Sequence, residues 1–505
     1  MATPTYELLS PLDHAFLALE GPTTCMHVAA TAVLDAAPLS TPEGGIDMAR
    51  IRAYVASRLS AIPRYRQRLA WVPVENRPVW IDDDHFDLEF HVRHSSLPKP
   101  GTTAQLQELC ARFLERPLDR SRPLWEMWVI EGVAGGRFAL HMKVHHCMVD
   151  GIAGVDLMSA LFRITAESHV DPIEPWVPRP APSEGQLLRD EMRRRLKMSA
   201  RALASVPQWL SGARETQDVI ARRLNNVWDL LRTGLSQPAA TPINQTISPH
   251  RRVRWLTLDM ADVKEIKRQL DGTVNDVVLT TVAGGLERFL AWRGCRPTSD
   301  LRLGVPVNVQ SHGGERGLGN HIWAWLVPVA AEVRGPIRRF RALQDATAEL
   351  KRSQQALAGE VISGALDWTS SNLVPLGAKL LHRLQPYNMM VTNVPGPQFP
   401  LYLLGSRIDE LYPWVPLFEN QGLAIALFSY DGKLSWSIGA DWDLVPDIDD
   451  FVEALDESFR DLRRAAGRVR ARKERTHASE FDAASATSER AASTGPAPGP
   501  LQRAM

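Results

Sequence analysis

Residues 137–164 read RFALHMKVHHCMVDGIAGVDLMSALFRI, a sequence typical of a strand, a turn and a helix in succession. If 138–146 is a strand, its side chains point alternately to two faces. One face then carries Phe138, Leu140, Met142, Val144 and His146, and the other carries Ala139, His141, Lys143 and His145. The two adjacent histidines therefore point to opposite faces, and only His146 ends an apolar row.

His146 is placed where a general base would be useful. An imidazole has an unperturbed pKa of about 6.5, which suits proton transfer near neutral pH. Asp150 and Gly151 follow it in the turn. A short carboxylate can accept hydrogen bonds that fix the turn, and glycine relieves the backbone where the chain reverses. The spacing predicts a histidine held next to a fixed turn.

Three other interpretations of these residues stay open. The histidines can be ordinary core or edge residues. They can bind a metal with Asp150, although residues on opposite faces and one carboxylate make a poor ligand set. Cys147 can be a nucleophile with a histidine base, although a free cysteine is usually an inert apolar residue. The histidine mechanism is favoured over the thiol one, and no metal site is expected.

The composition limits the class of protein. The 505 residues include 58 Lys and Arg and 58 Asp and Glu, so the formal net charge is zero. This balance argues against a nucleic-acid binder and against an acidic disordered chain. The length predicts two or three domains, or one large domain with two lobes.

Cysteine spacing and hydropathy indicate the compartment. The four cysteines lie far apart without a CxxC pair, which indicates neither a disulfide framework nor a thiolate zinc site. No signal peptide is recognisable at the amino terminus, and no run of about 18 apolar residues predicts a membrane span. We expect a cytoplasmic protein, and peripheral attachment to a membrane or to lipid inclusions stays open.

Helix-like and strand-like segments alternate along the chain and predict an α+β fold. We expect an amino-terminal lobe over 1–170 and a proline-rich linker with a basic helical connector over 171–250. A second lobe is expected over 251–466 and a disordered tail over 467–505, where Ala, Ser, Thr, Pro and Gly accumulate.

The connector is locally basic. Residues 186–235 contain ten Lys and Arg against five Asp and Glu. A basic amphipathic stretch with Trp209 and Trp228 can touch anionic lipid. The solvated face of a helical pair explains the same composition and is the favoured interpretation.

Several segments in a fixed order resemble one enzyme family. HHCMVDG at 145–151 matches the HHxxxDG signature of the CoA-dependent acyltransferase superfamily. The other segments are LSPLDHAFLALEGPTTCMHV from Leu9, RPLWEMWVIEG from Arg122, TVNDVVL from Thr273, VPVNVQ and LGNHI within 305–322, and VTNVPGPQFPLYLLG from Val391. Over about residues 8–465 the chain resembles the bacterial wax ester synthase/diacylglycerol acyltransferases.

This resemblance implies a fold and roles for the motif residues. The fold would be two chloramphenicol-acetyltransferase-like lobes with a substrate tunnel between them and HHxxxDG at its middle. His146 would deprotonate the acceptor hydroxyl, which attacks the thioester directly. His145 would support the local geometry, and Asp150 would be structural, next to Gly151.

A second motif matches the family's Asn-Asp pair. Asn275 and Asp276 are therefore candidates for substrate or oxyanion contacts. Thr273 and Asp276 also have the spacing of a capping box at the start of a helix. Asp276 can therefore have a structural role instead. Both interpretations stay open.

The implied reaction transfers a long-chain fatty acyl group from acyl-CoA to diacylglycerol or to a long-chain fatty alcohol, giving triacylglycerol or wax ester. No cofactor or metal is implied, because CoA arrives as part of the substrate. A non-catalytic lipid-binding or scaffolding protein and an acyltransferase with another acceptor, such as an amine, are the alternatives. The intact motif argues against the former, and the lack of a segment resembling a carrier protein argues against the latter.

Overall fold

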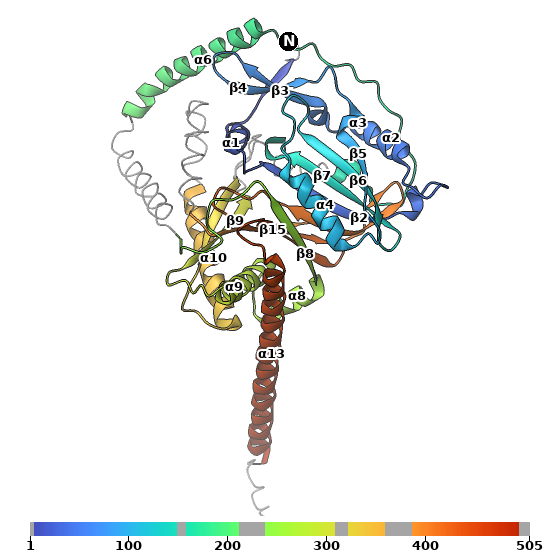
Figure 1. Cartoon of the computed structure of the whole chain (residues 1–505). Helices are drawn as coiled ribbons and strands as arrows, with labels where there is room; N and C mark the ends of the chain where they lie inside the picture. Colours follow the sequence, from blue (N-terminus) through green and yellow to red (C-terminus); the bar gives the residue numbers. More distant parts are fainter. Residues whose placement is uncertain (1–4, 149–157, 212–237, 309–321, 359–385, 494–505) are drawn as a thin grey trace, which may run out of the picture.

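The computed structural model describes residues 5–148, 158–211, 238–308, 322–358 and 386–493. Within them the chain forms two lobes, each built on a six-stranded sheet, and a three-stranded sheet beside the first lobe (Figure 1). The α+β class predicted from the sequence is confirmed.

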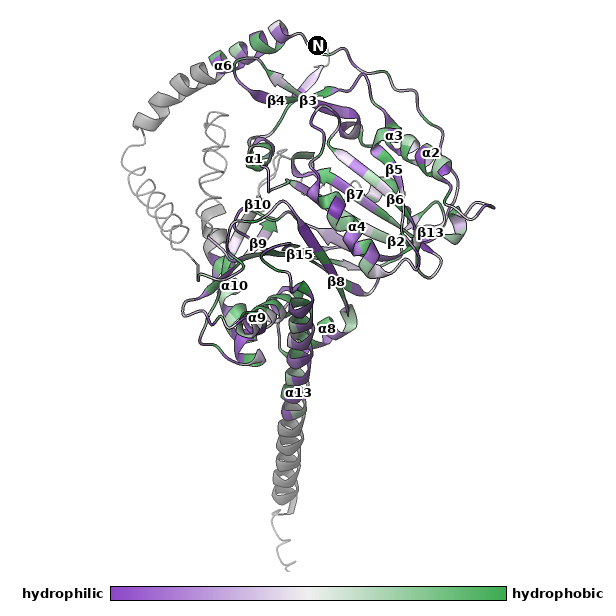
Figure 2. Cartoon of the chain, in the orientation of Figure 1, coloured by the Kyte–Doolittle hydropathy of each residue, from purple (hydrophilic) through white to green (hydrophobic). Residues whose placement is uncertain are grey.

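The sheet of the first lobe contains the strand that ends at the histidine pair. Its strands are, in order, β12 (Tyr402–Leu403), β13 (Ser406–Trp414), β2 (His27–Asp35), β7 (Arg137–His145), β6 (Trp125–Val133) and β5 (Val92–Ser96). β7 runs antiparallel to β2 and to β6. Helix α4 (Thr103–Glu115) packs on one face of the sheet, and α2 (Met48–Arg58) packs on the other. Hydrophobic and hydrophilic residues both occur along α4, as expected for a helix with one buried face (Figure 2).

Strands β12 and β13 come from a part of the chain expected in the second lobe. β13 pairs antiparallel with β2, from Ile408 opposite Leu34 to Trp414 opposite Ala29. The expected division at residue 251 is therefore wrong for residues 402–414. The physical reason is that β2 would otherwise present an open edge, which a strand from far along the chain closes.

The second lobe has its own sheet and a continuous apolar core. The strand order is β10 (Ile322–Val329), β9 (Leu301–Asn308), β11 (Met389–Pro395), β14 (Leu423–Tyr430), β15 (Lys433–Asp441) and β8 (Arg251–Asp259). β11 is parallel to its two neighbours, and the other pairs are antiparallel. The core also takes residues from α8 (Met260–Gln269), α9 (Val274–Trp292), α10 (Pro336–Ala358) and α13 (Ile448–Ser493).

Smaller elements complete the first lobe. The three-stranded sheet has the order β1 (Tyr6–Leu8), β4 (Arg77–Asp82) and β3 (Gln67–Val72). The short helices are α1 (Pro11–Leu19), α3 (Leu88–His91), η1 (Ala37–Leu39), η2 (Pro63–Arg66) and η3 (His146–Met148). In the connector, α6 (Glu184–Ser211) is helical as predicted and packs Leu187 against β3 and β4.

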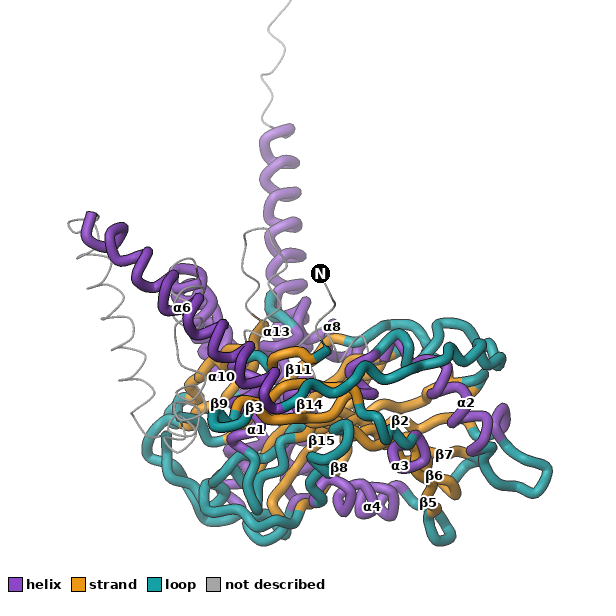
Figure 3. The backbone as a smooth tube through the Cα atoms, turned by 90° about the horizontal axis from the view of Figure 1, so that it is seen from above, coloured by secondary structure: helices purple, strands orange, loops and turns teal. Residues whose placement is uncertain are grey.

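Helices α6 and α13 both reach out from the packed lobes (Figures 1 and 3). α13 continues to Ser493, so the expected disordered tail is wrong for residues 467–493. Residues 468–493 contain neither Gly nor Pro and include several Ala, Glu and Arg, which are strong helix formers. Among the described residues, no helix is long and apolar enough to span a bilayer.

Candidate active site

His146 lies just beyond the end of β7. The strand stops at His145, one residue earlier than predicted, and His146 opens η3. The His146 N–H donates to the carbonyl of Met26 at 2.8 Å, which keeps the residue beside β2. Its ring stacks on Phe16 of α1, with centroids 3.9 Å apart and planes inclined by 27°. Helix α1 therefore fixes the imidazole from a part of the chain remote in sequence.

The imidazole of His146 is held in its basic, neutral form. Its Nδ1 atom is buried and has no hydrogen-bond partner among the described residues. Burial, with a further contribution from His145, lowers the pKa of His146 to about 4. At neutral pH such a ring is unprotonated and can accept a proton.

His145 makes a different set of contacts. The Cys147 N–H donates to His145 Nδ1 at 3.1 Å. On the other side of the ring, Nε2 lies 3.8 Å from Glu20 Oε2, and the exposed fractions of the two side chains are only 1% and 9%. His145 thus belongs to the turn that carries His146, and its supporting role in the reaction stays a prediction.

Glu20 is a residue that the sequence interpretation missed. It is the C-cap of α1 and accepts hydrogen bonds on Oε2 from Arg120 Nε at 3.0 Å and Nη2 at 2.5 Å. Burial raises the pKa of Glu20, but His145 and Arg120 outweigh that effect and lower it to about 2. The available signal was an acidic residue at the end of an apolar helix within the segment from Leu9, but nothing local connects it to His145.

The other face of β7 packs against α4. The predicted alternation is confirmed, because Met142 and Val144 lie in the core on the α2 side while Lys143 reaches the end of α4. Lys143 Nζ, the His27 ring and Cys25 Sγ together bond four successive backbone carbonyls there, those of Phe113, Leu114, Glu115 and Arg116. These groups satisfy the carbonyls that a helix end leaves without partners. This network is structural and holds α4 against the sheet.

Cys147 is buried beside the histidines. Burial raises the pKa of its thiol well above the ordinary value, and the nearby carboxylates of Asp13 and Glu20 act in the same direction. A neutral buried thiol is a poor nucleophile, which argues against the cysteine mechanism.

The Asn-Asp pair lies at the start of α9. Asp276 Oδ2 accepts hydrogen bonds from the Thr273 N–H and hydroxyl at 2.8 Å each, and the Thr273 hydroxyl accepts from the Asp276 N–H at 3.1 Å. The predicted capping box is therefore confirmed. Asn275 is half-buried, and its role in the site stays a prediction.

Two predicted motif residues, Asp150 and Gly151, follow η3 in the sequence. Asp150 and Gly151 lie outside the described residues, so their roles stay predictions. The tunnel between the lobes likewise stays a prediction. A small apolar pocket lies in the first lobe on the α2 side of β7, and its lining comprises Val55, Leu59, Ile62, Tyr65, Trp125, Glu126, Met127, Met142, Val144 and Leu161.

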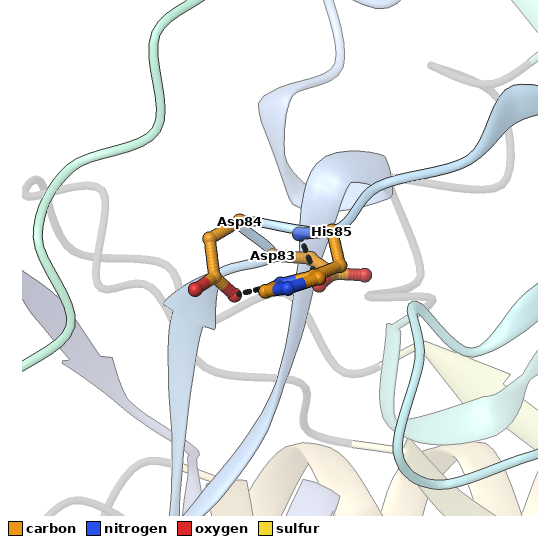
Figure 4. A group of neighbouring side chains, drawn as sticks. All are labelled: Asp83, Asp84 and His85. Atoms are coloured by element: carbon orange, nitrogen blue, oxygen red, sulfur yellow. Dashed lines mark hydrogen bonds and ion pairs between the residues drawn. The ribbon is translucent and has the colours of Figure 1, made fainter.

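One group among the described residues has the composition of a metal site, namely Asp83, Asp84 and His85 (Figure 4). His85 Nδ1 lies 3.1 Å from Asp84, and the His85 N–H donates to Asp83 Oδ1. Arg68 lies 3.5 Å from Asp83 and 3.7 Å from Asp84, so a guanidinium already supplies positive charge there. Asp84 and His85 are also exposed, and we assign the group no ligand.

Comparison with known proteins places the chain among acyltransferases. A family described as the wax ester synthase/diacylglycerol acyltransferase catalytic domain matches residues 9–278, and the WS/DGAT C-terminal domain matches residues 318–463. The chain belongs to the wax ester synthase/diacylglycerol acyltransferase family. The resemblance stated from the sequence is therefore confirmed, and the protein is an acyltransferase.

Two relatives come from Mycobacterium tuberculosis. A putative diacylglycerol O-acyltransferase is 34% identical over 472 residues, which cover 89% of this chain and 90% of the relative. A probable diacylglycerol O-acyltransferase is 32% identical over 413 residues, which cover 80% and 85% of the two chains.

Solved structures confirm the architecture. The wax ester synthase/diacylglycerol acyltransferase of Marinobacter aquaeolei has a TM-score of 0.64 at 24% identity, over 91% of this chain and 100% of that one. The first condensation domain of the calcium-dependent antibiotic synthetase has a TM-score of 0.55 at 17% identity, over 91% and 96%. The chain shares the two-lobed fold of both proteins.

Proposed function

We propose that the protein transfers a long-chain fatty acyl group from acyl-CoA to the hydroxyl of diacylglycerol, a long-chain fatty alcohol, or both. The products are triacylglycerol or wax ester. The observation that carries the proposal is His146 in a chain of this family, a half-buried imidazole with a buried Nδ1 that stacks on Phe16 and is neutral at physiological pH. The names of the mycobacterial and Marinobacter relatives support these two classes of acceptor.

In the proposed mechanism His146 removes the proton of the acceptor hydroxyl. The oxygen attacks the thioester carbonyl, the new C–O bond forms, and the C–S bond breaks as the tetrahedral intermediate collapses. The imidazolium then returns the proton to the departing thiolate, which leaves as CoA. Stacking on Phe16 limits rotation of the ring, so that the base is oriented before the substrate binds. Asn275 is our candidate for stabilising the oxyanion.

We propose that this reaction needs neither a metal nor a cofactor, since the thioester already activates the acyl group. Activity should therefore survive prolonged treatment with a chelator. Loss of activity on chelation, with recovery on adding back one metal ion, would contradict this part of the proposal.

The test is release of CoA from palmitoyl-CoA with diacylglycerol, with hexadecanol or without acceptor. Wild type is compared with His146→Ala and with the control His94→Ala, which removes an exposed histidine of the same lobe. We expect release that depends on the acceptor in wild type and in the control, and none in His146→Ala. If no acceptor stimulates release and His146→Ala equals wild type, the protein is not this enzyme, and binding of lipid becomes the function to test.

We further propose that the enzyme works at an anionic lipid surface, where its apolar acceptors reside. On α6, Met192 and Leu196 are 58% and 70% exposed. Arg189 and Arg193 each precede one of these residues by three positions, which places them next to it on the helix surface, and both are exposed, as is Lys197. Exposed apolar side chains flanked by cations are the composition of helices that bind anionic membranes.

Co-sedimentation with vesicles of phosphatidylcholine and phosphatidylserine tests this surface. The double variant Met192→Asp, Leu196→Asp should lose binding, and added salt should weaken binding of wild type. Val177→Asp, which changes an 82% exposed residue elsewhere, is the matched control. Equal binding of wild type and the double variant would rule out α6 as the lipid-binding element.

A further inference from the structure

A chain of contacts leads from the exposed Arg120 through Glu20 to the buried His145, behind the proposed base. We propose that Glu20, anchored by Arg120, is a positioning residue that holds His145 in its Nε2–H tautomer and thereby fixes the turn that presents His146. This inference rests on the proposed function, in which His146 is the general base.

The tautomer follows from one hydrogen bond. The Cys147 N–H donates to His145 Nδ1 at 3.1 Å, so Nδ1 carries no proton there. The proton of the neutral ring is then on Nε2, which lies 3.8 Å from Glu20 Oε2. A carboxylate on that side favours this tautomer, because the N–H dipole points at its negative charge. The other tautomer would bring two N–H groups together at Cys147 and open the turn.

Arg120 fixes the carboxylate. Its Nε and Nη2 both donate to Glu20 Oε2, and Nη2 also donates to the carbonyl of Leu17 at 2.9 Å. The guanidinium thus joins the carboxylate to the last turn of α1, and Glu20 remains ionised with a pKa of about 2. A fixed negative charge beside His145 is the result.

Two buried polar atoms of Glu20 and His145 indicate that the contact between these side chains becomes shorter during the reaction. Glu20 Oε1 and His145 Nε2 are buried and have no hydrogen-bond partner within the described residues. Leaving both unpaired costs free energy, and catalytic hydrogen bonds are often longer without substrate than with it. We infer that the Glu20–His145 contact shortens to a hydrogen bond when the substrates bind.

Helix α1 acts on both histidines at once. Its Phe16 stacks on His146, and its C-cap Glu20 faces His145. The orientation of the base therefore depends on α1, although α1 itself supplies no proton acceptor to the reaction.

Glu20→Gln is the variant that tests this role, and Asp82→Asn is its matched control. The Asp82 side chain is similarly buried and is also held by an arginine, Arg179, with its pKa likewise lowered to about 2, but none of its hydrogen bonds within the described part of the chain involves a histidine. Both variants replace a buried carboxylate by an amide of the same shape. A purely structural role predicts similar behaviour of the two, whereas positioning predicts a difference in kcat.

We expect Glu20→Gln to lower kcat by about 10- to 100-fold, as for other residues that orient a functional histidine, with KM for palmitoyl-CoA changed by less than about twofold. Asp82→Asn should keep kcat near the wild-type value even if it unfolds at a lower urea concentration than wild type. Glu20→Asp keeps the charge and should recover part of kcat, and it also serves if Glu20→Gln does not fold.

The tautomer itself is measured by NMR of full-length protein labelled with [15N]histidine, with His145→Gln used to assign the signal. We expect the Nε2–H pattern in wild type and a mixture of tautomers in Glu20→Gln. The positioning role is wrong if Glu20→Gln keeps wild-type kcat and tautomer while His146→Ala is inactive, or if Asp82→Asn loses as much kcat. If His146→Ala is instead fully active, it is the proposed function that fails.

Discussion

Lowering the pH is the perturbation that most directly tests His146 as the base. Burial lowers the pKa of His146 to about 4, whereas an exposed imidazole titrates near 6.5. Because the base acts in its neutral form, activity is lost as the pH falls through that pKa. At pH 5 about 90% of a base with a pKa near 4 is neutral, against about 3% of one with a pKa near 6.5. At pH 5 the rate expected for a base with a pKa near 4 is thus about 30-fold higher than that expected for a base with a pKa near 6.5.

The assay is CoA release at subsaturating palmitoyl-CoA, which gives kcat/KM and so the pKa of the free enzyme. We expect the rate to stay nearly constant from pH 7 to pH 5.5 and to fall only below about pH 5. An acid limb centred near pH 6.5 would refute the idea of a desolvated base. His94→Ala should superimpose on wild type, since His94 is exposed.

Stability has to be followed in the same samples, because the fold also depends on pH. Burial lowers the pKa of His91 to about 4 and that of His141 to about 3, as it does for His146. Between about pH 6.5 and those values the unfolded chain binds more protons than the folded one, so the free energy of unfolding decreases as the pH falls. Circular dichroism at each pH, and recovery of the rate on return to pH 7, separate titration of the base from unfolding.

Three further predictions concern single residues. Cys147→Ala should keep most activity because the buried thiol is neutral, and an inactive variant with a trapped acyl-enzyme would establish the thiol mechanism instead. Lys143→Met should lower the free energy of unfolding, measured by urea titration, by about 1–3 kcal/mol, because two backbone carbonyls at the end of α4 lose their donor. An unchanged urea midpoint would show that these two hydrogen bonds do not stabilise the fold. Gly396→Ala should cost about 1–3 kcal/mol, since its Cβ would overlap the Phe428 ring and the Ser429 carbonyl, and wild-type stability would contradict that packing.

Local patterns in the sequence were enough for much of the fold. The alternation along 137–145 identified β7 and its two faces, and Thr273 with Asp276 marked the start of α9. Such features depend on residues within a few positions of one another, where strand period and helix capping act. The same locality explains an error, because the small polar composition after residue 467 does not reveal that α13 continues to Ser493.

The motif at 145–151 pointed to the proposed base, and together with the other segments in their fixed order it identified the enzyme family. The sequence by itself therefore determined the class of chemistry and which histidine stands at the end of an apolar row. It did so because the identity and spacing of these residues are properties of the chain alone.

Only the tertiary structure decided how that histidine is held. Glu20 meets His145 across 125 positions of sequence, Phe16 stacks on His146, and β13 closes the edge of β2 from the far end of the chain. Each contact joins segments brought together by packing of whole elements, and no local pattern encodes which partners meet. The neutral state of His146 has the same origin, since the desolvation that lowers its pKa is a property of the packed environment and not of the residue.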